Sequence, residues 1–195
     1  MDTISHLHVE YKEALQPLIR QRLHSGDHCW LPPQPDSLKI NVDASVKKET
    51  GKFGVGVVVR NASGILMGAP AEPFEASWSV KHAELIAIRE ALRFCIDMGF
   101  HQGEIVIDCR EALQAVNSLP MNTQLDPDYF LVESLQEIFS LHSGFIGSFA
   151  SREANRVAQC IAQYATGLTH YESWLEVGPQ WHTTVLQADI CNSSL

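Results

Sequence analysis

Hydrophobic and polar positions alternate along several short stretches of the chain, and these stretches predict β-strands. Period-two alternation or a short apolar run bounded by turn residues is typical of a strand. The first three such runs are separated by only a few residues, which predicts an antiparallel meander. Five strands are predicted in all, at residues 39–45, 53–60, 65–67, 104–108 and 144–150.

Other stretches carry apolar residues at helical spacing and predict helices between and after these strands. The predicted helices cover residues 80–97, 110–119, 128–141 and 152–166. Gly99 ends the first of them in the usual C-terminal manner. The resulting order, βββ-α-β-α-α-β-α, implies an α/β fold in which parallel strands extend three antiparallel ones through helical crossovers. The expected architecture is a five-stranded mixed sheet flanked by helices.

The same pattern divides the chain into a core domain and two extensions. Residues 1–29 are predicted to form an amphipathic helical extension, with the helix itself over residues 3–23. The core domain covers residues 30–167 and opens on the stiff segment Trp30-Leu31-Pro32-Pro33. Residues 168–195 form a tail, for which we expect a short turn and helix around Trp174 and Trp181.

Composition narrows the class of protein. With 195 residues, of which 45% are hydrophobic, the chain can bury one core and is not globally disordered. No apolar stretch approaches the roughly 18 residues of a membrane span. The N-terminus lacks the features of a signal peptide. The five scattered cysteines form no zinc-like pair, so we expect an intracellular protein, in the nucleus or the cytoplasm.

The net charge of −9 works against tight binding of nucleic acid, because affinity for phosphates depends largely on Lys and Arg. Any such binding should be weak, carried by a divalent metal, or supplied by a partner.

Three acidic residues stand at positions where acids are unusual or could converge. Asp43 lies inside the first strand, Asp108 ends the fourth, and Glu84 lies early in the first core helix. If the two strands are neighbours, all three could meet; converging carboxylates repel one another unless a cation lies between them. Oxygen ligands of this kind suit Mg²⁺ or Mn²⁺.

Each acid also has a simpler interpretation. Asp108 could cap the helix that begins near residue 110, because Asp is a favoured N-cap. Glu84 is expected early in a helix from the helix dipole alone. Asp43 could be a strand-end residue. The presence of all three acids at these places in the predicted order of strands and helices favours the metal site.

At this point the sequence resembles a known family. Its motifs are similar to those of type 1 ribonuclease H and, more narrowly, of the plant reverse-transcriptase-like group derived from non-LTR retroelements. The resemblance covers roughly residues 30–189, and the segments that carry it are Leu38–Ala44, Gly54–Asn61, Ala83–Leu85, Ile107–Cys109 and Arg152–Ala158.

The resemblance implies a metal-dependent hydrolase that cuts the RNA strand of RNA–DNA hybrids with two metal ions. Asp43 would bridge both ions, and Glu84 and Asp108 would hold the pair from either side. The residues expected to touch nucleic acid are Asn41, Ser45 and Asn155.

Two positions depart from the family pattern. Gln159 stands where a fourth acid is expected, so it is at most a weak metal ligand, and Phe149 or Ala150 stands where the family usually carries a His. The first hypothesis is therefore a weakened RNA–DNA hybrid endoribonuclease.

The second hypothesis is a degenerate domain that binds nucleic acid, or a protein through the N-terminal helix or the tail. A transposase or exonuclease on the same scaffold is disfavoured by the glycine-bearing second strand and by the Arg-Glu-Ala-Asn run.

Overall fold

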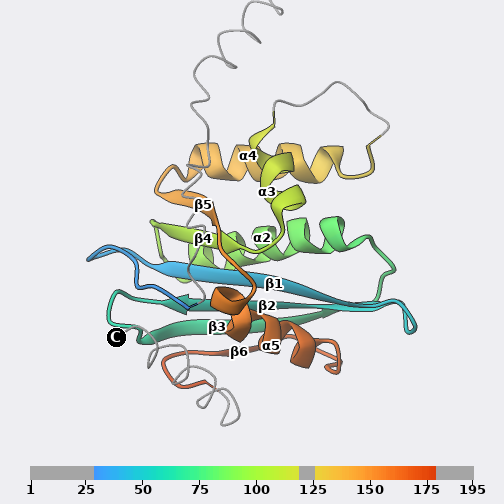
Figure 1. Cartoon of the computed structure of the whole chain (residues 1–195), viewed down its shortest axis with the longest axis horizontal. Helices are drawn as coiled ribbons and strands as arrows, with labels where there is room; N and C mark the ends of the chain where they lie inside the picture. The colour runs from blue at the N-terminus through green and yellow to red at the C-terminus, as the bar shows by residue number, and fades with distance from the viewer. Residues whose placement is uncertain (1–28, 119–125, 179–195) are drawn as a thin grey trace, which may run out of the picture.

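The structure is a computed structural model that describes residues 29–118 and 126–178. The predicted N-terminal helix and the part of the tail around Trp181 lie outside the described residues. Within them, the strands form one sheet with helices on both faces, and the labels of Figure 1 are used below.

The sheet has six strands in the order β5-β4-β1-β2-β3-β6. The meander is confirmed: β1 (Lys39–Lys47), β2 (Lys52–Arg60) and β3 (Leu66–Phe74) pair antiparallel. On one side, β4 (Gly103–Ile107) pairs parallel with β1, and β5 (Phe145–Phe149) pairs parallel with β4. On the other side, the short strand β6 (Glu172–Trp174) pairs antiparallel with β3. The predicted mixed sheet is thus correct, with one strand more than expected.

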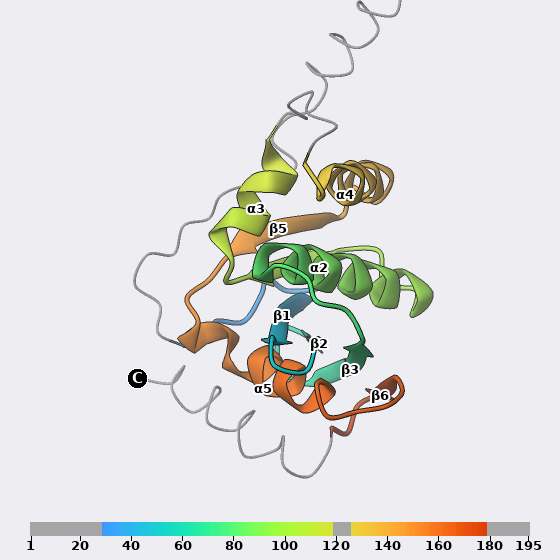
Figure 2. The ribbon, with the colours of Figure 1, turned by 90° about the vertical axis from the view of Figure 1, so that its right-hand side faces the viewer.

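The helices lie in two layers, as Figure 2 shows. Helix α2 (Val80–Asp97) covers one face of the sheet, and α3 (Arg110–Asn117) and α4 (Tyr129–Leu141) pack beside it. A 3₁₀ turn, η1 (Glu153–Asn155), leads into α5 (Arg156–Ala165) on the opposite face. The last helix therefore begins four residues later than its periodicity predicted, because the first turn after Arg152 is 3₁₀ rather than α.

Apolar side chains fill the space on both faces of the central strands. On the α2 face, Ile40, Val42 and Val57 of the sheet belong to one cluster with Leu85 and Ile88 of the helix. On the α5 face, a smaller cluster joins the sheet to the helix through Val58, Ala69, Ala71, Val157, Ala158 and Ile161. Strand β2 is buried on both faces, which explains its nearly continuous run of valines.

Two glycines of β2 bring α5 unusually close to the sheet. A Cβ atom at Gly56 would overlap the backbone of Ala158 and Ala162, and one at Gly54 would overlap that of Ala162 and Thr166. Only glycine leaves room for a helix backbone at this distance. Gly56 is the cross-strand partner of Asp43, so the approach fixes how near α5 comes to that acid.

Two sequence-based expectations at the β3 edge were wrong. The third strand runs from Leu66 to Phe74 rather than over residues 65–67, although Pro70 and Pro73 resemble strand breakers. Proline is tolerated there because β3 lies near the edge of the sheet and pairs only briefly with β6. Trp174, expected in a turn and helix, lies in β6, where the backbone satisfies polar groups on the outer edge of β3.

Candidate metal centre

The three predicted acids come from three elements that meet at one point. Asp43 lies on β1, Glu84 in the second turn of α2, and Asp108 directly after β4. Strands β1 and β4 are parallel neighbours in which Asn41 pairs with Val106, so Asp43 and Asp108 follow two residues later at the same level. Sequence reasoning required this adjacency, and the sheet supplies it.

Their carboxylates converge closely. One oxygen of each of Asp43, Glu84 and Asp108 lies within 4.8 Å of the other two. Among the described residues, no other group of three or more His, Cys, Asp or Glu side chains comes together in this way. The Glu84 Oε2 and Asp108 Oδ2 atoms are buried and accept no hydrogen bond within the described part of the chain.

Burial and mutual repulsion raise the pKa values of the three acids. The pKa of Asp43 rises from 3.8 to about 7, first because the carboxyl is buried and second because Asp108 lies nearby. Burial also raises the pKa of Glu84 well above 4.5, with the charges of Asp43 and Asp108 adding to it, while the Ala44 backbone N–H opposes the shift. Burial raises the pKa of Asp108 as well. Such a cluster is stable as three carboxylates only with positive charge beside it.

Arg152 supplies part of that charge. Its Nε lies 3.6 Å from Asp108 Oδ2, and the guanidinium lowers the pKa of Asp43, Glu84 and Asp108 alike. The Arg152 side chain is 74% exposed, so solvent screens much of this effect. The three acids thus offer buried carboxylate oxygens whose negative charge Arg152 neutralises only in part. Mg²⁺ and Mn²⁺ prefer oxygen ligands of this kind. The residues therefore fit a divalent cation.

The alternative of a helix cap is not observed for Asp108. The N-cap position of α3 is Cys109, and no side chain bonds to the helix N–H groups there. Asp128 occupies the N-cap position of α4, but its side chain makes no capping hydrogen bond. The Asp128 carboxylate instead pairs with Lys81 Nζ at 2.7 Å and His82 Nδ1 at 2.6 Å, because α2 brings both groups against it. Sequence reasoning missed this network, because Asp128 lies 46 residues along the chain from His82.

Two of the three residues predicted to touch nucleic acid are directed into the protein. Asn41 and Asn155 are each 1% exposed, and Asn41 Nδ2 lies 3.1 Å from Asn155 Oδ1. Their side chains join β1 to the segment before α5. Ser45 is half-buried near the end of β1, so direct contact with a substrate stays a prediction that fits Ser45 best.

The two departures from the family pattern lie on different elements, Gln159 on α5 and Phe149 at the end of β5. Gln159 is half-buried and follows Ala158, whose backbone lies against Gly56. Phe149 ends β5, and its ring carries the guanidinium of Arg110 at 3.9 Å from its centroid. Arg110 and Arg152 are the charged residues near the centre that sequence reasoning missed. The available signals were that Arg110 follows Asp108 by two residues and that Arg152 opens the Arg-Glu-Ala-Asn run.

The order of the strands, the helices on both faces and the convergent acids define a ribonuclease H-like domain. The chain belongs to the reverse transcriptase-like family, whose pattern matches residues 41–165.

Solved structures share the fold at low sequence identity. RNase H1 from the halophilic archaeon Halobacterium salinarum is 21% identical, with a TM-score of 0.58 over 66% of this chain and 96% of that one. LC11-RNase H1, isolated from compost, is 16% identical, with a TM-score of 0.60 over 67% of this chain and 96% of that one. A second LC11-RNase H1 structure, in complex with an RNA/DNA hybrid, is 17% identical, with a TM-score of 0.56 over 67% and 96%.

The comparison with curated proteins gives no match. In the part of the chain that the structure describes, no helix has both the length and the apolar character needed to cross a membrane.

Proposed function

We propose that this protein is a divalent-metal-dependent hydrolase of the RNA strand in RNA–DNA hybrids, with an activity weakened on the α5 side of its site. The observation that carries the proposal is the convergence of Asp43, Glu84 and Asp108, with buried carboxylate oxygens that accept no hydrogen bond within the described residues. A purely structural cluster would be expected to satisfy such atoms, because each unsatisfied buried polar group costs about 1–3 kcal/mol.

The three acids would hold Mg²⁺ or Mn²⁺ between β1, α2 and β4. When bound, such an ion supplies an activated water and neutralises charge on the scissile phosphate. The Asp43 carboxyl interacts electrostatically with both Asp108 and Glu84. Arg152, exposed and next to Asp108, can contact a phosphate oxygen of the substrate.

The residues at the two departures from the family pattern support one ion better than two. Gln159 brings an amide where the family pattern has a carboxylate, so it adds no charge to hold a second cation. Phe149 offers no group that can transfer a proton. We therefore expect slow hydrolysis and a stronger dependence on metal concentration than four acids would give.

The RNA–DNA hybrid is proposed as substrate by similarity of fold, since one structure of the same architecture contains such a hybrid. The net charge of −9 argues that the bound metal and the few exposed arginines would carry most of the attraction to phosphate.

The second candidate function is a module of the same fold that binds nucleic acid or a protein without cutting. The observation that favours it is the loss of both the fourth acid and the family His, at Gln159 and Phe149. Binding of the hybrid with no cleavage in either metal would support this candidate.

One assay separates the two. The whole protein is incubated with a labelled RNA–DNA hybrid in Mg²⁺ and then Mn²⁺, beside the Asp43→Asn and Gln159→Asp variants. Cleavage by the unmodified protein above the Asp43→Asn background supports the hydrolase, and a gain in Gln159→Asp identifies the missing acid as the limit. Absence of cleavage above that background in both metals would refute it.

A further inference from the structure

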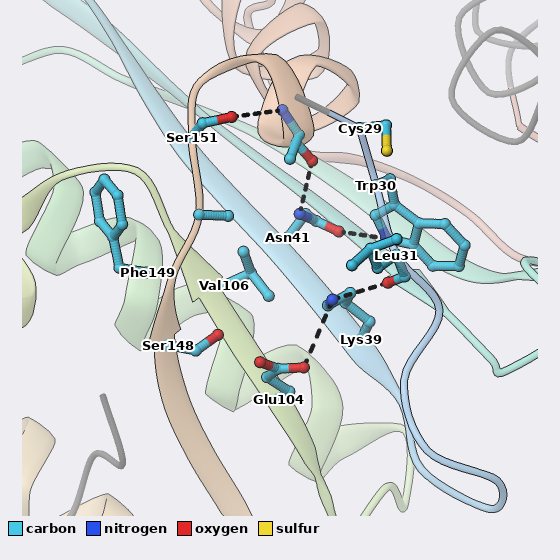
Figure 3. Close-up of a pocket in the computed structure, with 12 residues that line it drawn as sticks. Cys29, Trp30, Leu31, Lys39, Asn41, Glu104, Val106, Ser148, Phe149 and Ser151 are labelled. Carbon is cyan, nitrogen blue, oxygen red and sulfur yellow. Dashed lines mark hydrogen bonds and ion pairs between the residues drawn. The ribbon is translucent and has the colours of Figure 1, made fainter. Parts of the chain in front are cut away.

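A buried chain of hydrogen bonds leads from the segment before the domain to the acid cluster. Trp30 is 3% exposed, and its indole Nε1 donates to Asn41 Oδ1 at 3.1 Å (Figure 3). The indole ring stacks on the guanidinium of Arg60 at 4.0 Å. The next residue, Leu31, is held in place because its carbonyl accepts from Lys39 Nζ at 2.8 Å. The extended segment is therefore part of the core and not merely a linker.

The chemistry of the donors fixes the orientation of the Asn41 amide. Trp Nε1 and Arg nitrogens can only donate. The indole of Trp30 and Arg60 Nη2, at 3.2 Å, therefore both require the carbonyl oxygen of Asn41. Its Nδ2 must then face the other way, where it lies 3.1 Å from Asn155 Oδ1 and 3.4 Å from the Ala154 carbonyl.

The orientation is passed on to Asn155. Because Asn155 presents its oxygen to Asn41, its Nδ2 hydrogens face the β1 backbone and the acid cluster. One interaction is with the Val42 carbonyl at 2.7 Å. The Asn155 side chain also opposes the rise in the pKa of Asp108 that burial causes. Each amide in this relay has one orientation that satisfies its neighbours.

The relay is not a ligand pocket. The cavity that Trp30, Asn41, Val106 and Ser148 help to line has a volume of about 20 Å³, room for about one water molecule. The side chains of the relay, Trp30, Asn41 and Asn155, instead fix one another's orientation between residue 30 and the β1 backbone at Val42.

We propose that Trp30 is a positioning residue for the candidate metal centre, acting through Asn41 and Asn155 to hold the β1 backbone at Val42, next to Asp43, in the geometry that binds a cation. This inference rests on the proposed metal site. Partners that hydrogen-bond to metal ligands are worth about 10–100-fold in metal affinity. Trp30 acts through two intervening amides, so its share is smaller.

The test compares Mn²⁺ affinity, measured by calorimetry on the whole chain, between the unmodified protein and Trp30→Phe. Phenylalanine keeps an aromatic ring at this position but removes the N–H donor, together with part of the ring volume that the Trp174→Phe control also loses. Trp30→Phe is expected to weaken Mn²⁺ binding by about 3- to 10-fold. The matched control is Trp174→Phe on β6, the same substitution outside the relay, which should leave the affinity unchanged.

A double variant separates positioning from general destabilisation. In an Asn155→Ala background the relay is already cut, so adding Trp30→Phe should change Mn²⁺ affinity by less than about 1.5-fold. An equal loss in both backgrounds, or no loss in Trp30→Phe, overturns the inference.

Hydrogen exchange of the Asn155 side-chain amide, followed by NMR without metal, gives a second readout. Exchange should be faster in Trp30→Phe than in Trp174→Phe; equal exchange overturns the relay. This readout still decides if Asn155→Ala does not fold. If the unmodified protein binds no Mn²⁺, the proposed function fails, and the exchange result alone judges the relay.

Discussion

The two sides of the candidate site differ in charge although they are joined by the same sheet. On the β1–β4 side, Asp43, Glu84 and Asp108 bring three carboxylates within 4.8 Å of one another. On the α5 side, the chain offers Gln159 and the buried amide Asn155, both neutral, with Arg152 as the nearby charge. The helix is nevertheless fixed very near the acids by Gly56. The fold thus holds α5 close to the acids, but only the β1–β4 side carries the negative charge that a cation needs.

Replacing Asp43 should have the largest effect. Asp43→Asn keeps the shape of the side chain but removes the charge, and one oxygen ligand, of a carboxylate that interacts with both other acids. Loss of a hydrogen-bond partner of a ligand already costs about 10–100-fold in metal affinity, so loss of the ligand should cost about 100-fold or more. Calorimetry with Mn²⁺ measures it. An affinity within threefold of the unmodified protein would remove Asp43 from the site.

Adding charge to the α5 side should have the next largest effect. Gln159→Asp should raise the cleavage rate of a labelled hybrid by about 10-fold or more, if the missing carboxylate limits the hold on a second ion. The matched control is Gln163→Asp, one turn further along α5 on an exposed position. Equal rates in both variants would show that charge on this side is not limiting.

Forcing the two sides apart should destabilise the fold. Gly56→Ala places a methyl group against the backbone of Ala158 and Ala162, which cannot yield as a flexible side chain would. We expect a loss of about 2–3 kcal/mol in the free energy of unfolding. Urea denaturation measures it, with Gly51→Ala as a contrast: that position has open space, and the cost there comes only from its φ of 62°. Equal losses would mean that close packing of α5 is unimportant.

The pH dependence of stability should report the crowded acids. The pKa of Asp43 is raised from 3.8 to about 7, so the folded protein holds a proton that the unfolded chain has already released. Stability without metal should therefore fall as pH rises from about 4 to 7 and then level off, by at most about 4 kcal/mol from this group. Thermal unfolding across this range, beside Asp43→Asn, measures it. If the stability of Asp43→Asn falls with pH as steeply as that of the unmodified protein, Asp43 is not the group responsible.

Metal should reverse that trend. Cation binding requires deprotonated carboxylates, so the stabilisation by Mn²⁺ should increase through the same pH range. If Mn²⁺ does not stabilise Asp43→Asn at any pH, the stabilisation of the unmodified protein comes from binding at this site.

Removing Arg152 should have the smallest effect. Its guanidinium is 74% exposed and 3.6 Å from Asp108, so Arg152→Ala should lower stability without metal by less than about 1 kcal/mol. With Mn²⁺ bound, the difference should shrink, because the ion neutralises the same carboxylates. A larger loss in the metal-bound protein would show that Arg152 acts on something other than their charge.

Much of the domain could be predicted from hydrophobic periodicity alone. The residues of α2 were predicted to the residue, and β1, β2 and both parallel strands were predicted within two residues of their ends. Periodicity works there because each element buries one face or, for β2, both. It failed at β3, where Pro70 and Pro73 hide a strand whose pairing depends on its place in the sheet.

The candidate site divides in the same way. The sequence by itself determined which acids to consider. Asp43 inside an apolar strand, Asp108 at the end of another and Glu84 early in a helix are local signals. Only the tertiary structure decided that their oxygens meet, that Asn41 and Asn155 face inward, and that Trp30 is buried against Arg60. The physical reason is that alternation assigns a side chain to a face of a strand, whereas its partner on that face can come from far along the chain, as Asn155 does for Asn41 across 114 positions.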